Sequence, residues 1–277
     1  MKLQCPVCGE ELNAGSRSFV CGNRHSFDRS RHGYVNLLQR QKKRLRGDDA
    51  AMIRARRDFL ESGAYQPLLD AVTAAVAEKS GGVCHLADIG CGEGWYSCSL
   101  LQTLLANGND AMLAGFDISP DALRYAGARA KQMHLQDRTL WAVASVNRIP
   151  LADDTADVLI NLFAPCLAGE FCRILRPDGL LLRAVPLERH LWELKEALYA
   201  EPYENRPLLE APEGFRLEQK QEIRFRFHVA GAALQNLFAM TPYAHKTAAA
   251  DAEKLRVLHE LDVQAEFGLL RCRRITP

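Results

Sequence analysis

The chain has 277 residues, of which 48% are hydrophobic and 25% charged, with a formal net charge of +1. This balance is typical of a globular protein with one large domain and a small one. It excludes a polycation, so a nucleic-acid interface has to be a local patch. Because the sequence has neither an apolar run of about 18 residues nor a signal-peptide core, it predicts a cytoplasmic protein with no membrane partner.

The N-terminal segment, up to about residue 35, is rich in Cys, Gly and Arg and needs a covalent or metal link to fold. The chain has nine Cys, an odd number, which without a secretion signal argues against a disulfide framework. Four protein ligands would leave no position for water, so we predict one structural Zn²⁺ per chain. The ligands, in C-x2-C-x12-C-x3-H spacing, are Cys5, Cys8, Cys21 and His25.

Basic residues dominate the rest of this segment and the linker that follows. Between Ser16 and Arg46 there are nine Lys or Arg and a single acid, Asp28, with aromatic residues among them. Such cations contact phosphates and such aromatics stack on unpaired bases, although a solvated linker is the alternative. Next to a zinc knuckle we favour RNA, and we expect residues 1–36 to form a zinc-binding, RNA-recognition module. The expected RNA contacts of the linker are Lys42, Lys43, Arg44 and Arg46.

Two helices are expected after this linker. Asp49–Leu60 carries Met52, Ala55 and Phe59 on one stripe, and a second helix begins at Pro67, a residue that suits the first helical position. Residues 37–80 are therefore expected to be a basic linker and helices that pack on the catalytic domain.

From residue 81 to residue 277, short apolar runs alternate with helical stretches. The alternation predicts a parallel sheet with helices on both faces. Near the C-terminus, Ile223–Val229 alternates apolar and polar residues as a half-exposed strand does, and Val263–Leu270 can pair with it. The expected helices begin at Trp95 and span Pro120–Gln132. The expected parallel strands are Val83–Ile89, Ala111–Asp117, Leu140–Ala144, Val158–Phe163 and Leu180–Val185.

A glycine-rich turn follows the first of these strands. The run Asp88-Ile89-Gly90-Cys91-Gly92-Glu93-Gly94 ends a buried strand in an acid and opens a helix, whose unpaired N–H groups suit a carboxylate. Asp117 ends the next strand, where an acid can accept both hydroxyls of a ribose. The expected cofactor contacts are Asp88, Gly90, Gly92, Glu93, Gly94 and Asp117.

A dinucleotide-binding fold is the alternative for this turn. Its fingerprint needs a third glycine where Trp95 stands, and a Trp would hold the helix away from the strand. The Asp-x-Gly-x-Gly-x-Gly form resembles S-adenosylmethionine sites instead. The sequence therefore predicts an α/β fold with a Rossmann-like class I methyltransferase sheet, mostly parallel with an antiparallel C-terminal hairpin, plus the small zinc-binding module.

Together these motifs resemble one family, the bacterial large-subunit (23S) ribosomal RNA guanine-N1 methyltransferases. The resemblance covers nearly the whole chain, and the order of the motifs is specific although each motif alone is not. Besides the zinc ligands and the glycine turn, the shared segments are His32–Leu38, Gly47-Asp48, Ala55–Leu60, Gly63–Leu68, Ala164–Cys166, Arg189–Lys195 and Met240–Pro242.

The resemblance implies a two-domain enzyme, often a homodimer, that methylates N1 of a guanine in a hairpin of large-subunit ribosomal RNA. It also implies cofactor contacts from Tyr65, Gly92, Glu93 and His190. Tyr65 lies just before a helix that can cap the site, whereas nothing in the periodicity selects His190.

Methylation at guanine N1 requires the loss of the N1 proton, so a general base is useful. Asp48 and Asp28 are the candidates, although either can equally be a helix cap or an ion-pair partner. Two other functions stay open: a methyltransferase of the same fold that acts on a small molecule or protein, and a non-catalytic RNA-binding scaffold. The intact glycine turn and Asp117 count against the scaffold, and the basic knuckle counts against a small-molecule substrate.

Overall fold

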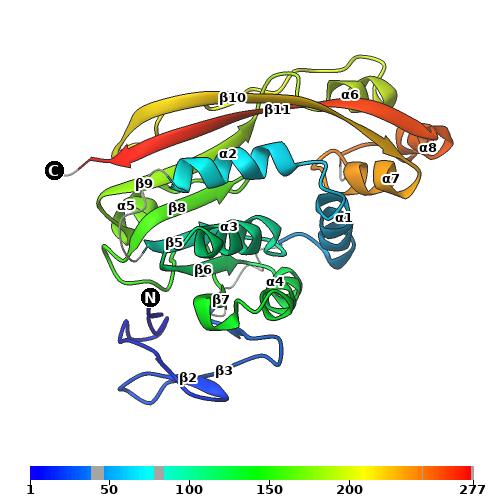
Figure 1. Cartoon of the computed structure of the whole chain (residues 1–277). Coiled ribbons are helices and arrows are strands. Elements are labelled where there is room, and N and C mark those ends of the chain that lie inside the picture. The colour runs from blue at the N-terminus through cyan, green and yellow to red at the C-terminus, as the bar shows by residue number, and fades with distance from the viewer. Residues whose placement is uncertain (39–46, 78–83, 245, 276–277) are drawn as a thin grey trace.

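An eight-stranded sheet forms the centre of the computed structural model, which describes residues 1–38, 47–77, 84–244 and 246–275 (Figure 1). The strand order is β10-β11-β9-β8-β5-β6-β7-β4. Neighbouring strands from β4 to β9 are parallel, and β11 pairs antiparallel with both β9 and β10, which confirms the predicted sheet. The strands are β4 (Tyr34–Asn36), β5 (Cys84–Ile89), β6 (Ala111–Asp117), β7 (Thr139–Val143), β8 (Ala156–Leu162), β9 (Leu175–Pro186), β10 (Phe215–Ala230) and β11 (Glu260–Arg274).

Local capping signals set the start of two of the predicted helices. The Asp49 side chain accepts hydrogen bonds from the N–H groups of residues 51 and 52, and Ser119 caps a helix with Pro120 in its first turn. The four C-terminal helices α5–α8 are short and were not predicted. The helices are α1 (Ala50–Leu60), α2 (Gln66–Ala77), α3 (Trp95–Ala106), α4 (Pro120–Gln132), α5 (Ala168–Ile174), α6 (Trp192–Leu198), α7 (Ala232–Ala239) and α8 (Ala249–Val257), with a 3-10 turn at Gln136–Arg138.

Different elements pack on the two faces of the sheet. Alternate side chains of a strand point to opposite faces, so Leu86 of β5 packs in the cluster that contains α2, α3 and α4. Its neighbour Ala87 packs in a second cluster with α5 and the N-terminal module. Because both faces are covered, the strands are apolar along most of their length, as the sequence predicted.

The N-terminal module contains its own small antiparallel sheet and also joins the large one. Its strands are β1 (Asn13–Ala14), β2 (Ser18–Val20) and β3 (Ser26–Asp28). Leu3 and Phe19 of the module pack in the same apolar cluster as Ile89 of β5. The predicted boundaries 1–36, 37–80 and 81–277 remain predictions, and β4, which lies within the first range, pairs with β7 of the large sheet.

The carboxyl ends of β5 and β8 form the point where the chain changes direction across the sheet. After β5 the chain adds β6 and β7 on one side, whereas β8 and β9 lie on the other side. Ligands of open α/β sheets bind in the crevice at such a switch point. Within the described part of the chain, no helix has the length and apolarity of a membrane span.

Candidate active site and metal centre

The glycine turn between β5 and α3 has three glycines in left-handed conformations, with φ of +83° at Gly90, +56° at Gly92 and +78° at Gly94. A Cβ on Gly90 would lie 2.4 Å from Cβ of Ala164, and one on Gly94 would meet α4, so packing requires both glycines. A Cβ on Gly92 would have only the Arg56 guanidinium within 4 Å, at 3.9 Å. Gly92 is therefore the glycine that leaves room for a ligand.

Asp117 holds this turn from the end of β6. Its carboxylate accepts the backbone N–H of Gly92 at 3.0 Å and the N–H of Ser119 at 2.8 Å. Burial raises the pKa of Asp117, and these two N–H groups oppose the shift. Each carboxylate oxygen keeps acceptor capacity, so the side chain can still receive the hydroxyls of a ribose.

Asp88 has a different environment within β5. The Ser97 hydroxyl of α3 donates to its carboxylate at 2.5 Å, so the pair links the strand to the helix that follows the turn. Burial, together with the nearby charges of Asp117 and Glu93 and against the hydrogen bond from Ser97, raises the pKa of Asp88 to about 7. This carboxyl group is therefore only partly ionised near neutral pH.

A cation from α1 lies beside the turn and was missed by the sequence reasoning. Arg56 pairs with Asp48 at 2.6 Å, and its charge partly offsets the rise that burial causes in the pKa of Glu93. The sequence contained a signal for this placement. Arg56 is four residues after Met52 and three before Phe59, so helical periodicity puts it on the buried side of α1. The arginine adds positive charge where the turn and the start of α3 already favour a carboxylate.

The two predicted candidates for a general base lie in different places. Asp48 is beside the glycine turn through its ion pair with Arg56, and its backbone carbonyl is 3.5 Å from the Ser119 hydroxyl. Asp28 is exposed on β3, in the small sheet of the N-terminal module. The structure therefore brings Asp48 to the predicted cofactor contacts and does not bring Asp28 there. A catalytic role for either residue remains a prediction.

Tyr65 and His190, which only the resemblance selected, lie together in an aromatic cluster. Nδ1 of His190 accepts the N–H of Glu266 at 3.1 Å, and its Nε2 is 3.5 Å from the Tyr65 hydroxyl. Burial and the charge of Lys195 lower the pKa of His190 to about 3, so the ring is neutral and carries its proton on Nε2. The rings of Phe59, Phe225, Phe227 and Phe267 surround Tyr65.

Tyr96 connects this aromatic cluster with the glycine turn. Its ring packs edge-on against Trp95 at 4.8 Å, at the start of α3. Burial raises the pKa of Tyr96, and the charges of Tyr65 and Glu93 add to the effect, so these groups lie near one another. The predicted contacts Tyr65 and Glu93 therefore belong to one region of the molecule.

Phe163, immediately after β8, was also missed by the sequence reasoning. Its side chain is 47% exposed and its φ is +62°, a conformation that bulky residues rarely adopt. Its ring lies 5.3 Å from that of Phe267, and the next residue, Ala164, packs against Gly90. The backbone thus holds an exposed aromatic ring one residue before the contact with the glycine turn. No sequence signal identifies this strain, because φ depends on the tertiary contacts.

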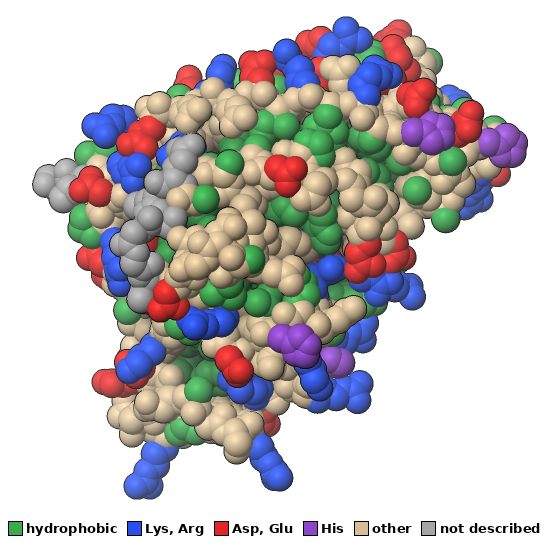
Figure 2. All heavy atoms as spheres, in the orientation of Figure 1, with side chains coloured by type: hydrophobic (Ala, Val, Ile, Leu, Met, Phe, Trp, Pro, Cys, Tyr) green, Lys and Arg blue, Asp and Glu red, His purple; other side chains and the backbone are tan. Residues whose placement is uncertain are grey.

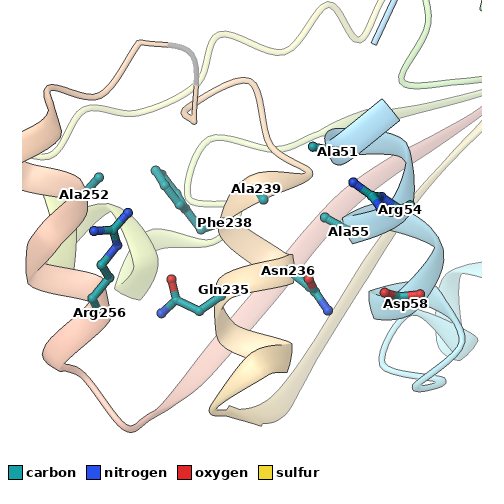
Figure 3. A pocket seen from close by; sticks show the side chains of 10 residues that line it. All are labelled: Ala51, Arg54, Ala55, Asp58, Gln235, Asn236, Phe238, Ala239, Ala252 and Arg256. Atoms are coloured by element: carbon teal, nitrogen blue, oxygen red, sulfur yellow. The ribbon is translucent and has the colours of Figure 1, made fainter. Parts of the chain in front are cut away.

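The other side of α1 borders a hollow of about 510 Å³, which Figure 3 shows. Arg54 and Asp58 of α1 line it opposite Asn236 of α7 and Arg256 of α8. None of the predicted cofactor contacts lines this hollow. It is therefore separate from the site at the glycine turn, which faces Arg56.

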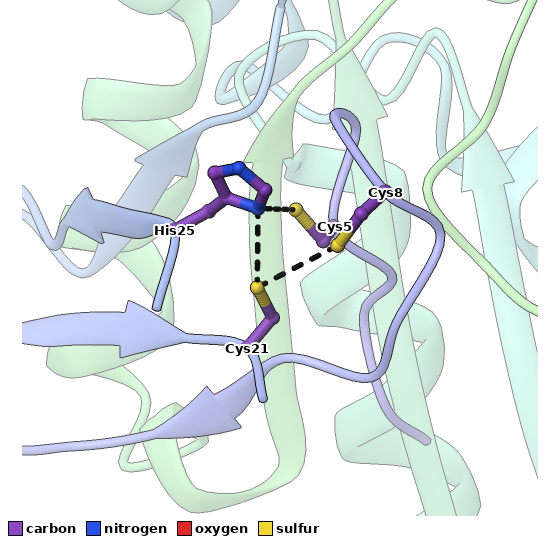
Figure 4. A group of neighbouring side chains, drawn as sticks. All are labelled: Cys5, Cys8, Cys21 and His25. Carbon is purple, nitrogen blue, oxygen red and sulfur yellow. Dashed lines mark hydrogen bonds between the residues drawn. The ribbon is translucent and has the colours of Figure 1, made fainter. Parts of the chain in front are cut away.

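The four predicted zinc ligands point toward one another at the N-terminal end of the molecule (Figure 4). Sγ of Cys21 is 3.7 Å from Sγ of Cys8 and 3.4 Å from Nδ1 of His25, and Sγ of Cys5 is 3.6 Å from the same nitrogen. Tetrahedral zinc, with Zn–S of about 2.3 Å and Zn–N of about 2.05 Å, separates two sulfurs by about 3.8 Å and a sulfur and a nitrogen by about 3.6 Å. The donor atoms therefore fit a zinc ion as they stand.

Two tight turns place these ligands. The N–H of Gly9 donates to the carbonyl of Cys5 and the N–H of Arg24 donates to that of Cys21, both at 2.9 Å. Gly9 and Arg24 have φ of +79° and +63°, so a left-handed residue directly follows Cys8 and another directly precedes His25. A hydrogen bond with the Asn23 side chain lowers the pKa of the Cys8 thiol to about 6, which favours the thiolate that zinc requires.

The module that holds this metal centre carries several exposed arginines. Arg17, Arg24, Arg29 and Arg31 of the module are exposed, and Figure 2 shows basic side chains projecting from the lower end of the molecule, where the module lies. The predicted RNA contacts Lys42, Lys43, Arg44 and Arg46 lie outside the described residues. The described part of the module is therefore a basic surface by itself.

Comparison with known proteins finds a matching family for each of the two parts of the chain. The family described as RlmA, N-terminal, a zinc ribbon, matches residues 3–46, and a methyltransferase domain matches residues 82–231. The 23S rRNA (guanine(748)-N(1))-methyltransferase of Streptomyces fradiae is 34% identical over 97% of this chain and 96% of the relative. YxjB of Bacillus subtilis (strain 168), provisionally named a 23S rRNA (guanine-N(1)-)-methyltransferase, is 32% identical over 97% of this chain and 95% of the relative. The chain belongs to the 23S rRNA (guanine-N1) methyltransferase family.

A solved structure agrees with the fold of this methyltransferase. The YcgJ protein of Bacillus subtilis aligns with a TM-score of 0.51 over 76% of this chain and 98% of that chain. At 11% identity the likeness shows the fold alone. The predicted class I methyltransferase sheet with an N-terminal zinc ribbon is thus confirmed, and so is an S-adenosylmethionine-dependent enzyme with a structural zinc.

The residues around the glycine turn fit S-adenosylmethionine. The hydroxyl of Tyr96 and the indole N–H of Trp141 are buried without a hydrogen-bond partner among the described residues, and a Cβ on Gly94 would lie 3.4 Å from the Trp141 ring. Unpaired buried polar atoms are costly, and a polar ligand at the turn can satisfy them. Together with the open space at Gly92, these unpaired atoms fit a polar cofactor at the turn, and the individual contacts remain predictions.

Proposed function

We propose that the protein transfers a methyl group from S-adenosylmethionine to N1 of a guanine in a hairpin of large-subunit ribosomal RNA. The observation that carries the proposal is the agreement of the whole chain, zinc ribbon included, with relatives named for this reaction. A methyltransferase acting on a small molecule has no evident use for a zinc ribbon with four exposed arginines, whereas phosphates do.

The residues at the switch point can supply binding and alignment. When bound, S-adenosylmethionine supplies a methyl group that the positively charged sulfur has already activated. The space at Gly92, with Arg56 beside it, suits the carboxylate end of that molecule, and Asp117 suits its ribose. Tyr65 and Glu93 complete this region, and His190 supports Tyr65 through the contact between Nε2 and the hydroxyl.

Phe163 offers a platform for the target base. Guanine N1 lies on the edge used in base pairing, so the base has to leave its helix before N1 can be methylated. An exposed aromatic ring can stack on the unpaired base, a contact worth about 1–3 kcal/mol. Phe163 holds such a ring beside the glycine turn through its backbone conformation.

The N1 proton has to leave as the bond from N1 to the methyl carbon forms and the bond from sulfur to that carbon breaks. Asp48 is the acid that we propose for this step, because it is partly exposed beside Arg56 and the turn. It can accept the proton and release it to water. Replacement of Asp48 by Asn should lower kcat more than the affinity for either substrate, with the largest loss at low pH.

RNA binding and assembly complete the proposal. The linker cations Lys42, Lys43, Arg44 and Arg46 follow the module in the sequence, and they are the further residues that contact phosphates. Replacing all four by Ala should reduce the slope of log affinity for RNA against log salt by about 3–4 units if each touches a phosphate. The active protein is a cytoplasmic homodimer, which sedimentation of the purified chain tests directly.

Methyl transfer to RNA tests the main proposal. Labelled S-adenosylmethionine should label 23S rRNA from a strain that lacks this gene, with 1-methylguanosine as the product and Gly92→Val as the inactive control. Label in a protein or small molecule, and none in RNA, would support the alternative substrate. No transfer to any acceptor, with RNA binding intact, would support a non-catalytic scaffold.

A further inference from the structure

A pocket of about 640 Å³ lies between β9 and residues 203–208. Arg183 and Val185 line it from the strand, and Asn205 and Arg206 line it from the facing segment. Lys195 fixes that segment by donating to the carbonyl of Tyr203 at 2.7 Å and to the Asn205 side chain at 2.9 Å. The Asn205 amide in turn donates to the carbonyl of Leu187 at 2.7 Å, so the wall of the pocket is held in place.

Arg183 places a buried positive charge in this pocket. It is 8% exposed, and its Nε is buried with no hydrogen-bond partner among the described residues. No ion pair of Arg183 is found in the part of the chain that the structure describes, and its positive charge only opposes the rise that burial causes in the pKa of the Cys166 and Cys272 thiols. A buried charge left unpaired is strongly unfavourable, so the arrangement favours an anion from outside the chain.

The pocket lies at the same edge of the sheet as the cofactor site. Arg183 of β9 is directly opposite Asn161 of β8, and the Asn161 amide donates to the carbonyl of Ile89, the residue before Gly90. Two strand spacings, about 10 Å, therefore separate Arg183 from the start of the glycine turn. Phe163 follows Asn161 by two residues, so the pocket, the proposed base platform and the turn all lie near the carboxyl ends of β5, β8 and β9.

We propose that this pocket binds a phosphate of the RNA strand beside the guanine that is methylated, with Arg183 as the buried contact and Arg206 at the rim. The inference rests on the proposed function, since it places this phosphate relative to the methylated base. A phosphodiester carries one negative charge and oxygens that accept two parallel hydrogen bonds from a guanidinium. Contacts to phosphates fix the register of a nucleic acid on a protein, so this one would position the base at Phe163.

The charges around the pocket agree with an anion of low charge. Lys195 is fully buried, and its hydrogen-bond partners are a carbonyl and an amide oxygen rather than a carboxylate. The acid among the residues that line the pocket is Glu204, which is exposed. Leu208 and Tyr203 at the rim are 75% and 48% exposed, which offers apolar contact to a ribose or base next to the phosphate.

The test uses the full chain and an unmodified 23S rRNA transcript, with affinity measured at several salt concentrations. Arg183→Met should weaken RNA binding about tenfold. It should also reduce the slope of log affinity against log salt by about 0.7–0.9, the value for one phosphate contact. Arg183→Lys should keep the slope and lose part of the affinity, because a lysine retains the charge but not the paired donors. Arg206→Met should give a smaller loss in the same direction.

Two controls separate a binding role from a structural one. Arg216→Met removes an arginine whose side chain is 71% exposed on β10, and it should change neither RNA affinity nor slope. The melting temperature of Arg183→Met should stay the same or rise, because an apolar side chain replaces an unpaired buried charge. Affinity for S-adenosylmethionine should be unchanged in every variant.

Unchanged RNA affinity and slope in both Arg183→Met and Arg206→Met would overturn the proposal. A second result would also overturn it. Inorganic phosphate would raise the melting temperature of the wild type but not of Arg183→Met, while both proteins bind RNA equally. The pocket would then hold a free anion rather than a phosphate of the RNA. If the wild type binds RNA through Arg183 and transfers no methyl group to it, the proposed function fails and the pocket stands. If the wild type methylates RNA and the variants bind it normally, only the pocket fails.

Discussion

The metal centre and the cofactor site are built from segments of very different extent along the chain. The zinc ligands all lie between Cys5 and His25, in two tight turns. The proposed cofactor site combines α1, the glycine turn, the end of β6 and the segment after β8. A small segment with few apolar residues depends on the metal for its folding free energy, whereas the cofactor site depends on the core that brings its segments together.

The two regions nevertheless share part of that core. Leu3 and Phe19 of the module pack in the same cluster as Ile89, the residue before the glycine turn. The strand β4 pairs with β7, and His32 lies against Gly127 of α4. The two sites should therefore respond independently to local changes and jointly to changes at the contact between them.

Loss of the metal should have the largest effect. Cys8→Ser should release the zinc and disorder the first ~35 residues, because structural zinc sites contribute on the order of 10–16 kcal/mol of apparent binding free energy. Metal analysis and hydrogen exchange of the N-terminal amides would measure the loss, with Cys172→Ser, a half-buried cysteine outside the cluster, as the control. Affinity for S-adenosylmethionine should persist. A metal-free chain with an ordered N-terminus would contradict the comparison.

Asp117→Ala should affect only the cofactor site. The variant loses the acceptor of the Gly92 and Ser119 N–H groups together with the proposed ribose contacts. Titration calorimetry should find a loss of about 2–4 kcal/mol in binding free energy for S-adenosylmethionine. The zinc content should not change, and Asp121→Ala, at an exposed position of α4, should bind the cofactor normally. Equal affinity in both variants would remove Asp117 from the site.

Gly127→Ala tests the contact between the two regions. Its Cβ would lie 1.9 Å from the carbonyl oxygen of His32, so α4 or the chain before β4 has to move. Denaturant unfolding should show a loss of about 1–3 kcal/mol, with faster hydrogen exchange in β4. The matched control is Gly169→Ala, where nothing lies within 4 Å of the added Cβ. If the two variants unfold alike, the module is independent of the large domain.

The pH dependence of stability changes least within any one pH unit, and it distinguishes two buried groups near the proposed cofactor site. The pKa of His190 is lowered to about 3, so the unfolded chain binds its proton first and stability falls as pH drops from about 6.5 toward 3. The pKa of Asp88 is raised to about 7, so stability falls instead as pH rises from about 4 to 7. Each group contributes at most about 1.4 kcal/mol per pH unit.

Single variants separate these opposite slopes. His190→Gln should remove the loss of stability at low pH, and Asp88→Asn should remove the loss toward neutral pH, in denaturant titrations from pH 4 to pH 7. Gln keeps an acceptor for the Glu266 N–H, so the comparison reports mainly on the proton. The same pH profile in both variants and the wild type would mean that neither group keeps its shifted pKa in solution. Zinc content should be equal in all three proteins at pH 7.

The sequence by itself determined the parts of this protein that depend on residues close together in the chain. The spacing of Cys5, Cys8, Cys21 and His25 was enough for the metal centre, because two short turns bring these ligands together. The sequence also identified the glycine turn and Asp117, because each lies at the end of a buried strand. The periodicity of apolar residues gave the central strands, although β9, β10 and β11 extend beyond the ranges predicted for them.

Only the tertiary structure decided which distant residues join these local motifs. Arg56 reaches the turn because α1 packs on it, Phe163 is exposed because its φ is held at +62°, and Arg183 is buried opposite Asn161 through the register of β8 and β9. His190 meets Tyr65 across 125 residues of chain. These placements depend on the packing of the whole sheet, and a pattern of neighbouring residues carries no information about contacts that only the folded core creates.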